Sequence, residues 1–128
     1  MTTYEPYNDE VRECFENPVH AADLNNGYAE VLVADVSESA EGSRLVLSAA
    51  VVDGMIVAIR FRVWGCPHLI AAAEIVCREH EGEPVEGLAD IRANELLRRL
   101  AAGAGKTGRL LLLEDAARSL LKQHHDQY

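Results

Sequence analysis

The sequence predicts an α+β fold in which a three-stranded antiparallel sheet packs against several helices. Apolar residues alternate with polar or small ones on both sides of Asp53-Gly54, a residue pair that is a strong signal for a two-residue hairpin turn. After position 66 the apolar residues recur at helical spacing instead. Strands followed by helices, without βαβ alternation, are typical of one sheet covered by helices.

The first third of the chain supplies a short helix and the first strand. Residues 8–16 have the pattern of a helix, and Asn17-Pro18 ends it because a residue before proline is pushed out of the helical region. A loop then leads to a strand near residues 28–35, and the polar residues 37–43 make a turn.

The hairpin supplies the other two strands. The outgoing strand carries apolar residues at alternate positions from Leu45 to Val51, and the returning strand carries them from Val57 to Val63. Trp64 then belongs to the opposite, outer face of the sheet. The inward-facing set that we predict for the returning strand and the next helix is Val57, Ile59, Phe61, Val63, Leu69, Ile70, Ala73 and Val76.

The second half of the chain is helical. Pro67 suits the first position of a helix, where its missing N–H costs nothing, and this helix continues to Gly82. Asn94 is the predicted cap of a further helix, and a final helix runs from about Leu110 to His124.

Composition indicates one globular domain spanning residues 1–128. The chain is 48% hydrophobic and has a formal net charge of -9 without any Lys/Arg-rich run, which argues against nucleic acid and anionic membrane as partners. No apolar stretch approaches the length of a membrane span. Three cysteines without an export signal predict reduced thiols and a cytoplasmic location.

Cys66 is the best candidate for chemistry. It follows the returning strand and precedes the helix that opens at Pro67, and the unpaired N–H groups of a helix N-terminus favour the thiolate, the form that binds metal or accepts sulfur. The alternative is a small residue that fills a tight turn. Cys14 and Cys77 share helical faces with apolar neighbours, so we expect both to be core residues.

His68 is a second, weaker candidate ligand. Cys66 and His68 together offer only two ligands, whereas a stable zinc or iron site normally has four, so a surface histidine in the first helical turn is the favoured interpretation. Neither His20 nor His80 has a ligand partner nearby in the sequence, and His124 and His125 belong to a polar tail. We also find no phosphate-binding loop and no catalytic triad, so we expect a protein that is not an enzyme.

Four segments, taken in order, resemble the IscU/NifU-type iron–sulfur cluster scaffold family over about residues 7–127. They are Glu16-Asn17-Pro18, Arg60 to Cys66, Ala71-Ala72-Ala73 and Leu113 to Ala117. The resemblance implies the scaffold fold, a role in iron–sulfur cluster assembly, a cysteine desulfurase or another assembly protein as partner, and a cluster-ligand position at Cys66.

The same resemblance shows where this chain departs from the family. The first family cysteine belongs to a turn that corresponds to residues 39–43, where Ala40 and Gly42 stand. The final His-Cys pair corresponds to Gly108 and Arg109. Because a [2Fe–2S] cluster needs four ligands, we expect no stably bound cluster or zinc.

Three functions therefore remain open from the sequence. The first, which we favour, is a scaffold-like protein that binds iron, sulfur or assembly partners weakly through Cys66. The second is a cluster-free interaction module that docks through Trp64 and the exposed face of the sheet. The third is a sulfur-transfer protein in which Cys66 accepts a persulfide.

Overall fold

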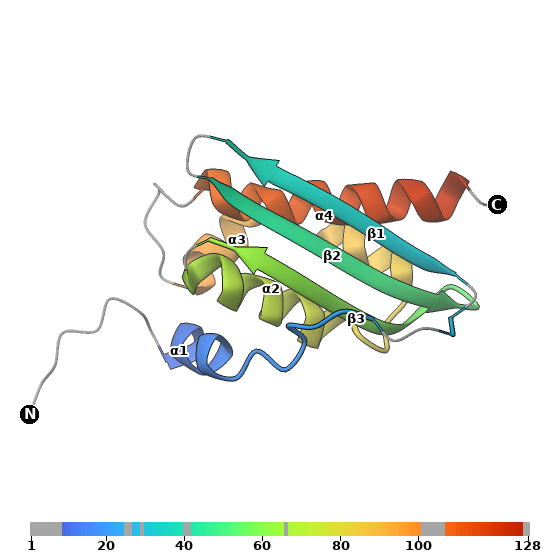
Figure 1. Ribbon diagram of the computed structural model, residues 1–128, viewed down its shortest axis with the longest axis horizontal. Helices are drawn as coiled ribbons and strands as arrows, with labels where there is room; N and C mark the ends of the chain where they lie inside the picture. The colour runs from blue at the N-terminus through green and yellow to red at the C-terminus, as the bar shows by residue number, and fades with distance from the viewer. Residues whose placement is uncertain are drawn as a thin grey trace, which may run out of the picture.

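The structure is a computed structural model that describes residues 9–24, 27–28, 30–39, 42–65, 67–100 and 107–126. Its three strands form one antiparallel sheet in the order β1-β2-β3, which confirms the predicted fold class (Figure 1). The elements are α1 (Asp9–Glu16), β1 (Val31–Glu38), β2 (Ser43–Val52), β3 (Met55–Trp64), α2 (Pro67–His80), the 3-10 helix η1 (Val85–Asp90), α3 (Ala93–Arg99) and α4 (Thr107–Asp126).

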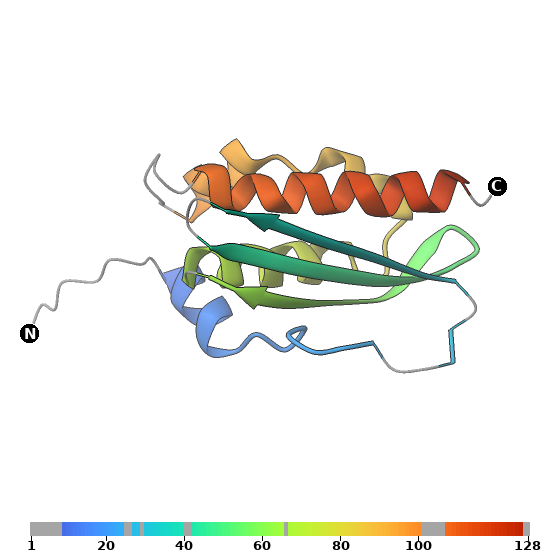
Figure 2. The same ribbon diagram turned by 45° about the horizontal axis from the view of Figure 1, so that its top comes forward.

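The helices cover one face of the sheet and leave the other face open (Figure 2). Helix α2 packs against β3, α4 packs against β1 and β2, and α1 packs against α2. The segment after α1 runs along β3 before the chain enters β1 (Figures 1 and 2). None of the described helices is long and apolar enough to cross a membrane.

The hairpin between β2 and β3 has the predicted turn, but the returning strand contains a bulge. Asp53 and Gly54 have φ values of 53° and 77°, as a two-residue hairpin turn requires. The register shifts because Ala50 pairs with Ala58 whereas Val51 pairs with Ile56, so β3 has one extra residue at this point.

The bulge overturns the inward position that we predicted for Val57. Ile56 and Ile59 are both fully buried, whereas Val57 is 45% exposed. The extra residue lets both isoleucines reach the core, which strict alternation does not allow. Phe61 is buried as predicted, and Val63 is partly buried against the core.

The helices and the first strand follow the prediction in outline but differ from it in detail. Helix α3 begins at Ala93 with Arg92 as its cap residue, so the prediction of Asn94 as the cap was wrong. Helix α4 starts before Leu110 and continues past His124, and η1 was not predicted. Strand β1 lies three residues further along the chain than predicted, which shortens the following turn. Of the predicted inward residues of α2, only Ile70 is not fully buried.

Candidate functional site

Three chain connections meet at one end of the sheet. At this end β1 and β3 finish and β2, α2 and α4 begin (Figure 1). Glu38 at the end of β1 pairs with Ser43 at the start of β2. The fold therefore brings together described parts of three segments that are distant in the sequence: Gly42-Ser43, Gly65 with Pro67-His68, and the start of α4.

A close contact fixes the connection between β3 and α2. A Cβ atom on Gly65 would lie 3.2 Å from Ser43 Oγ and 3.4 Å from Leu69 Cδ2, so a larger residue would force its neighbours to move. Ser43 is itself buried at the start of β2. Cys66 lies outside the described residues, but Gly65 before it and Pro67 at the start of α2 are described.

His68 occupies a different environment from the one that we predicted. His68 lies in the first turn of α2 and is only 6% exposed, so the interpretation as a surface histidine was wrong. Burial arises because α2 lies between the sheet, α1 and α4, and its residues from His68 to Cys77 are buried with the exception of Ile70.

The two other neighbourhoods carry no typical metal ligand at their described positions. Gly42 is an exposed turn residue with a φ of 73°, and Arg109 is a half-buried residue in the first turn of α4. Ala40 and the side chain at position 108 lie outside the described residues. Within the described ranges, no group of three or more His, Cys, Asp or Glu side chains is arranged to hold a metal ion.

An aromatic side chain lies on the outer face of the sheet beside this end. Trp64 is 50% exposed, as predicted, and the Arg44 guanidinium lies 4.7 Å from the centre of its ring. Arg44 also donates two hydrogen bonds to Asp35, at 2.9 and 2.6 Å. The arginine therefore bridges the ring and the carboxylate.

The two other cysteines are core residues, as predicted. Cys14 is 2% exposed and Cys77 is fully buried. Burial raises the pKa of the Cys77 thiol well above its ordinary value, and the charges of Glu74 and Glu81 add to this effect. Cys77 is therefore an unreactive thiol in the folded protein.

The prediction that His124 and His125 belong to a polar tail was wrong. Both lie in the last turns of α4, where His124 Nδ1 is 2.8 Å from Glu30 and His125 Nε2 is 2.8 Å from Glu86. His80, at the end of α2, is half-buried, and burial lowers the pKa of its imidazole.

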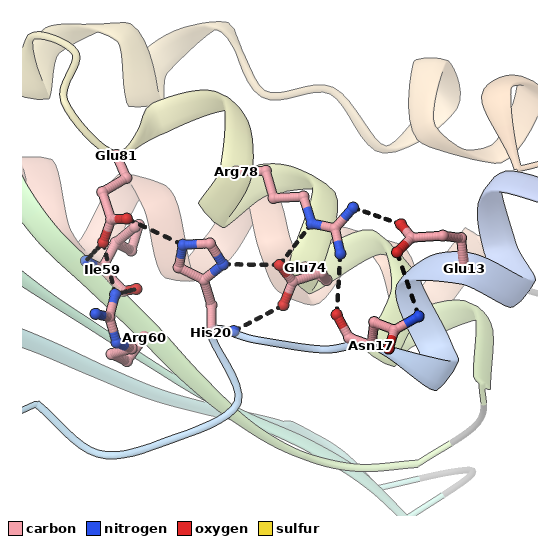
Figure 3. Close-up of polar contacts among 8 residues, drawn as sticks. All are labelled: Glu13, Asn17, His20, Ile59, Arg60, Glu74, Arg78 and Glu81. Atoms are coloured by element: carbon pink, nitrogen blue, oxygen red, sulfur yellow. Dashed lines mark hydrogen bonds and ion pairs between the residues drawn. The ribbon is translucent and has the colours of Figure 1, made fainter.

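A buried polar network lies along the side of α2 that faces the segment after α1 (Figure 3). Glu74 is fully buried and accepts hydrogen bonds from the His20 backbone N–H at 2.9 Å and from Arg78 Nε at 2.7 Å. His20 Nδ1 is 2.7 Å from Glu74, and His20 Nε2 is 3.1 Å from Glu81. The ring therefore lies between two carboxylates.

Glu81 extends this network to the edge of β3. Its carboxylate accepts hydrogen bonds from the Ile59 N–H and from Arg60. Partial burial of Glu81 disfavours its charged form. Hydrogen bonds from Arg60 and the His20 ring outweigh this burial and lower the pKa of the carboxyl.

Comparison with known proteins identifies the family. The model of the NifU-like N terminal domain matches residues 6–127. The chain belongs to this family. The resemblance that the sequence motifs predicted is thereby confirmed.

Related proteins and structures agree with this assignment. The chain is 26% identical to Iron-sulfur cluster assembly protein 2 of Arabidopsis thaliana, over 94% of the chain and 75% of the relative. It is also 26% identical to Iron sulfur cluster assembly protein 1, mitochondrial, of Schizosaccharomyces pombe, over 94% of the chain and 64% of that protein. The crystal structure of the N-terminal part of a NifU-like protein from Brucella abortus has the same fold, with a TM-score of 0.75, 18% identity and coverage of 94% of this chain and 95% of the other.

The polar network is the feature of this NifU-like domain that the sequence analysis missed. His20 is separated by 54 residues from Glu74 and by 61 from Glu81, so their contact has no local pattern. One sequence feature does indicate a buried carboxylate, because Glu74 interrupts the apolar run Leu69 to Cys77 of α2. A charged residue at such a position needs a polar partner from elsewhere in the fold.

Proposed function

We propose that this NifU-like domain acts in iron–sulfur cluster assembly as a scaffold-type binding protein that does not hold a stable cluster by itself. Iron, sulfur or an assembly partner such as a cysteine desulfurase would be engaged weakly at Cys66. The observation that carries the proposal is the composition of the sheet end, where Gly42 and Arg109 stand in neighbourhoods that the family uses for ligands.

The donor set does not fit a [2Fe–2S] cluster. Such a cluster is held by four ligands, usually thiolates, and the chain has no cysteine between Cys14 and Cys66 or after Cys77. Cys66 and the buried His68 supply two donors at most. We therefore treat the cluster as cargo that is assembled or passed on with other proteins, rather than as a resident cofactor.

The charge at the sheet end favours sulfur over iron as the species received. Arginine stays protonated at all physiological pH values, so Arg109 at the start of α4 adds a fixed positive charge. The N-terminus of α2 adds a partial positive charge beside position 66. Both favour a thiolate or persulfide anion and disfavour a bound cation. We propose binding and transfer, without catalysis, in the cytoplasm.

A second candidate function is a cluster-free interaction module. It is favoured by Trp64, which is 50% exposed and held against Arg44. Tryptophan and arginine are enriched among the residues that dominate binding energy at protein interfaces. In this alternative Cys66 is a packing residue and the outer face of the sheet engages the partner.

Two measurements on the intact chain test the proposal. After anaerobic incubation with iron, sulfide and thiol, we expect no stoichiometric metal and no cluster absorption to survive gel filtration. Alkylation followed by mass spectrometry is expected to label Cys66 faster than Cys14 and Cys77, with a pH dependence that reports an easily ionised thiol.

Either measurement has an outcome that contradicts the proposal. Stoichiometric metal that survives gel filtration in the wild type but not in Cys66→Ser would reveal a stable site. A Cys66 thiol that labels no faster than the two core cysteines would exclude sulfur acceptance and favour the interaction module.

A further inference from the structure

The segment of residues 17–24, called the strap below, lies along the outer edge of β3. The Phe61 N–H donates a hydrogen bond to the His20 carbonyl at 3.0 Å, and Ala21 forms a single parallel bridge with Phe61. Further along, Arg62 contacts Asp23 at 3.2 Å. The strap therefore takes the place that an added strand would take at this edge, over a short length.

Apolar burial contributes little to holding the strap. Val19 is 71% exposed, Ala21 and Asp23 are also exposed, and the three remaining apolar side chains of the strap are half-buried. His20 is the one buried strap residue, at 8% exposure. Among the side chains of the strap, His20 therefore supplies the buried attachment.

His20 makes four polar contacts, and Figure 3 shows those with Glu74 and Glu81. Its backbone N–H and Nδ1 contact the two oxygens of Glu74, its Nε2 contacts Glu81, and its carbonyl accepts from Phe61. Hydrogen bonds with charged partners are stronger than neutral ones, and burial strengthens them further. No other natural side chain presents two nitrogens at these opposite positions on one flat ring.

The same carboxylate also anchors α1. Arg78 donates through Nε to Glu74, through Nη1 to Glu13 at 2.6 Å, and through Nη2 to the Asn17 carbonyl at 2.9 Å. An open groove of about 230 Å³ lies beside this contact. It is lined by Glu13, Cys14, Ile75, Arg78, Glu79 and Arg99.

We propose that the contacts of His20 with Glu74 and Glu81 act as a clasp. When these contacts break, the strap and α1 are released together while the sheet and the other helices stay folded. Opening uncovers the outer edge of β3 at Phe61 and the thiol of Cys14. Cys77 stays buried, since it faces the core of the domain from α2. The clasp is a conformational device built into the N-terminal part of the domain, and it does not depend on what Cys66 binds.

The two core cysteines make this proposal measurable. In the native protein a buried thiol is alkylated through transient opening, so its rate reports the population of the open form. We compare the wild type with His20→Gln, whose amide cannot contact Glu74 and Glu81 at once. We expect Cys14 to be labelled about tenfold faster or more in this variant, with the labelling of Cys77 unchanged.

Two control variants separate the clasp from neighbouring contacts. Asp23 lies on the same strap, and Asp23→Asn removes its ion pair with Arg62 of β3. His125→Gln removes the exposed contact between His125 and Glu86, far from the strap in the sequence. Both are expected to label Cys14 within about twofold of the wild-type rate, because exposed ion pairs contribute little.

Three results would overturn the proposal. Unchanged Cys14 labelling in His20→Gln would show that the residue does not control the segment. Equal acceleration of Cys14 and Cys77 would show that His20 stabilises the whole fold rather than a local unit. An effect of Asp23→Asn as large as that of His20→Gln would show that the attachment is distributed along the strap.

Discussion

Small residues determine how closely the chain packs around the candidate site. A Cβ atom on Gly65 would lie 3.2 Å from Ser43 Oγ, closer than an ordinary van der Waals contact. Ala71, Ala72 and Ala73 are fully buried in α2, where they allow the helix to lie close to its neighbours. Since interiors are packed at crystal-like density, a larger residue at any of the three alanine positions is expected to shift α2 away from its neighbours.

At the residue scale we predict that Phe61→Ala destabilises the protein by about 3–5 kcal/mol. Phe61 is 2% exposed in the core, so its truncation removes apolar burial and leaves a cavity. The measurement is urea unfolding followed by circular dichroism.

The matched control for this prediction is Val57→Ala on the same strand. Val57 is 45% exposed at the bulge, so we expect a loss of at most about 1 kcal/mol. Comparable losses for the two variants would contradict the inward and outward assignments of β3.

At the scale of elements, other parts of the chain bind backbone groups on both edges of the sheet. On β3, the Ile56 N–H donates to the Glu83 carbonyl, and the Ile59 N–H donates to the Glu81 carboxylate. On β1, the Val33 N–H donates to Gln123 Oε1 of α4 at 3.2 Å, and Gln123 Nε2 donates to the Val33 carbonyl at 2.7 Å. Backbone groups that are bound in this way are not available for pairing with another strand.

The hairpin gives a second prediction. Gly54 has a φ of 77° with nothing within 4 Å of a built Cβ, so Gly54→Ala introduces backbone strain without a steric clash. We expect a loss of about 1–2 kcal/mol in urea unfolding.

Gly87→Ala is the matched control, because its Cβ would meet His80 Nδ1 at an ordinary 3.6 Å and its φ lies outside the left-handed region. This variant should be neutral or more stable by about 0.4–1 kcal/mol, since alanine restricts the unfolded chain. A Gly54→Ala variant as stable as the wild type would mean that the turn differs from the one described.

At the scale of the whole molecule, the sequence predicted what local patterns determine. The hairpin at Asp53-Gly54 and the helix from Pro67 have strong local signals, and both were correct. The bulge at Val57 depends on core contacts and on the pairing of residues 82–84 with β3, which no alternation pattern contains. The burial of His68 likewise depends on the elements around α2.

The candidate site was predictable only in outline. The motifs identified the family and the three neighbourhoods that converge, because they are continuous stretches of sequence. The contact of His20 with Glu74 was not predictable, since the two residues are joined only by the tertiary fold.

Carboxylates that pair with arginine, in this network and elsewhere, lead to a prediction about acid stability. The pKa values of four carboxyl groups are lowered in the folded protein: those of Glu81, Glu13, Asp23 and Asp35. For Glu13, Asp23 and Asp35 the leading cause is a hydrogen bond from an arginine. For Glu81 burial raises the pKa, and hydrogen bonds from Arg60, His20 and the Ile59 N–H outweigh it. A carboxyl with a lowered pKa binds fewer protons in the folded than in the unfolded state, so stability falls as the pH falls. For Glu81 the contribution is complete above the ordinary glutamate value of 4.5 and is lost as the pH falls through the lowered pKa of the folded state.

We therefore predict that Glu81→Gln destabilises the protein by about 1 kcal/mol at pH 7 and by less at pH 4. The amide still accepts a hydrogen bond, but it lacks the charge that Arg60 and His20 contact. Glu86→Gln, in which an exposed carboxylate loses its contact with the exposed His125, is the control, and we expect it to change the stability little because exposed ion pairs contribute little. The measurement is urea unfolding at a series of pH values from 7 to 4. A stability difference for Glu81→Gln that stays constant across this range would mean that the carboxylate acts through its shape rather than through its ionisation.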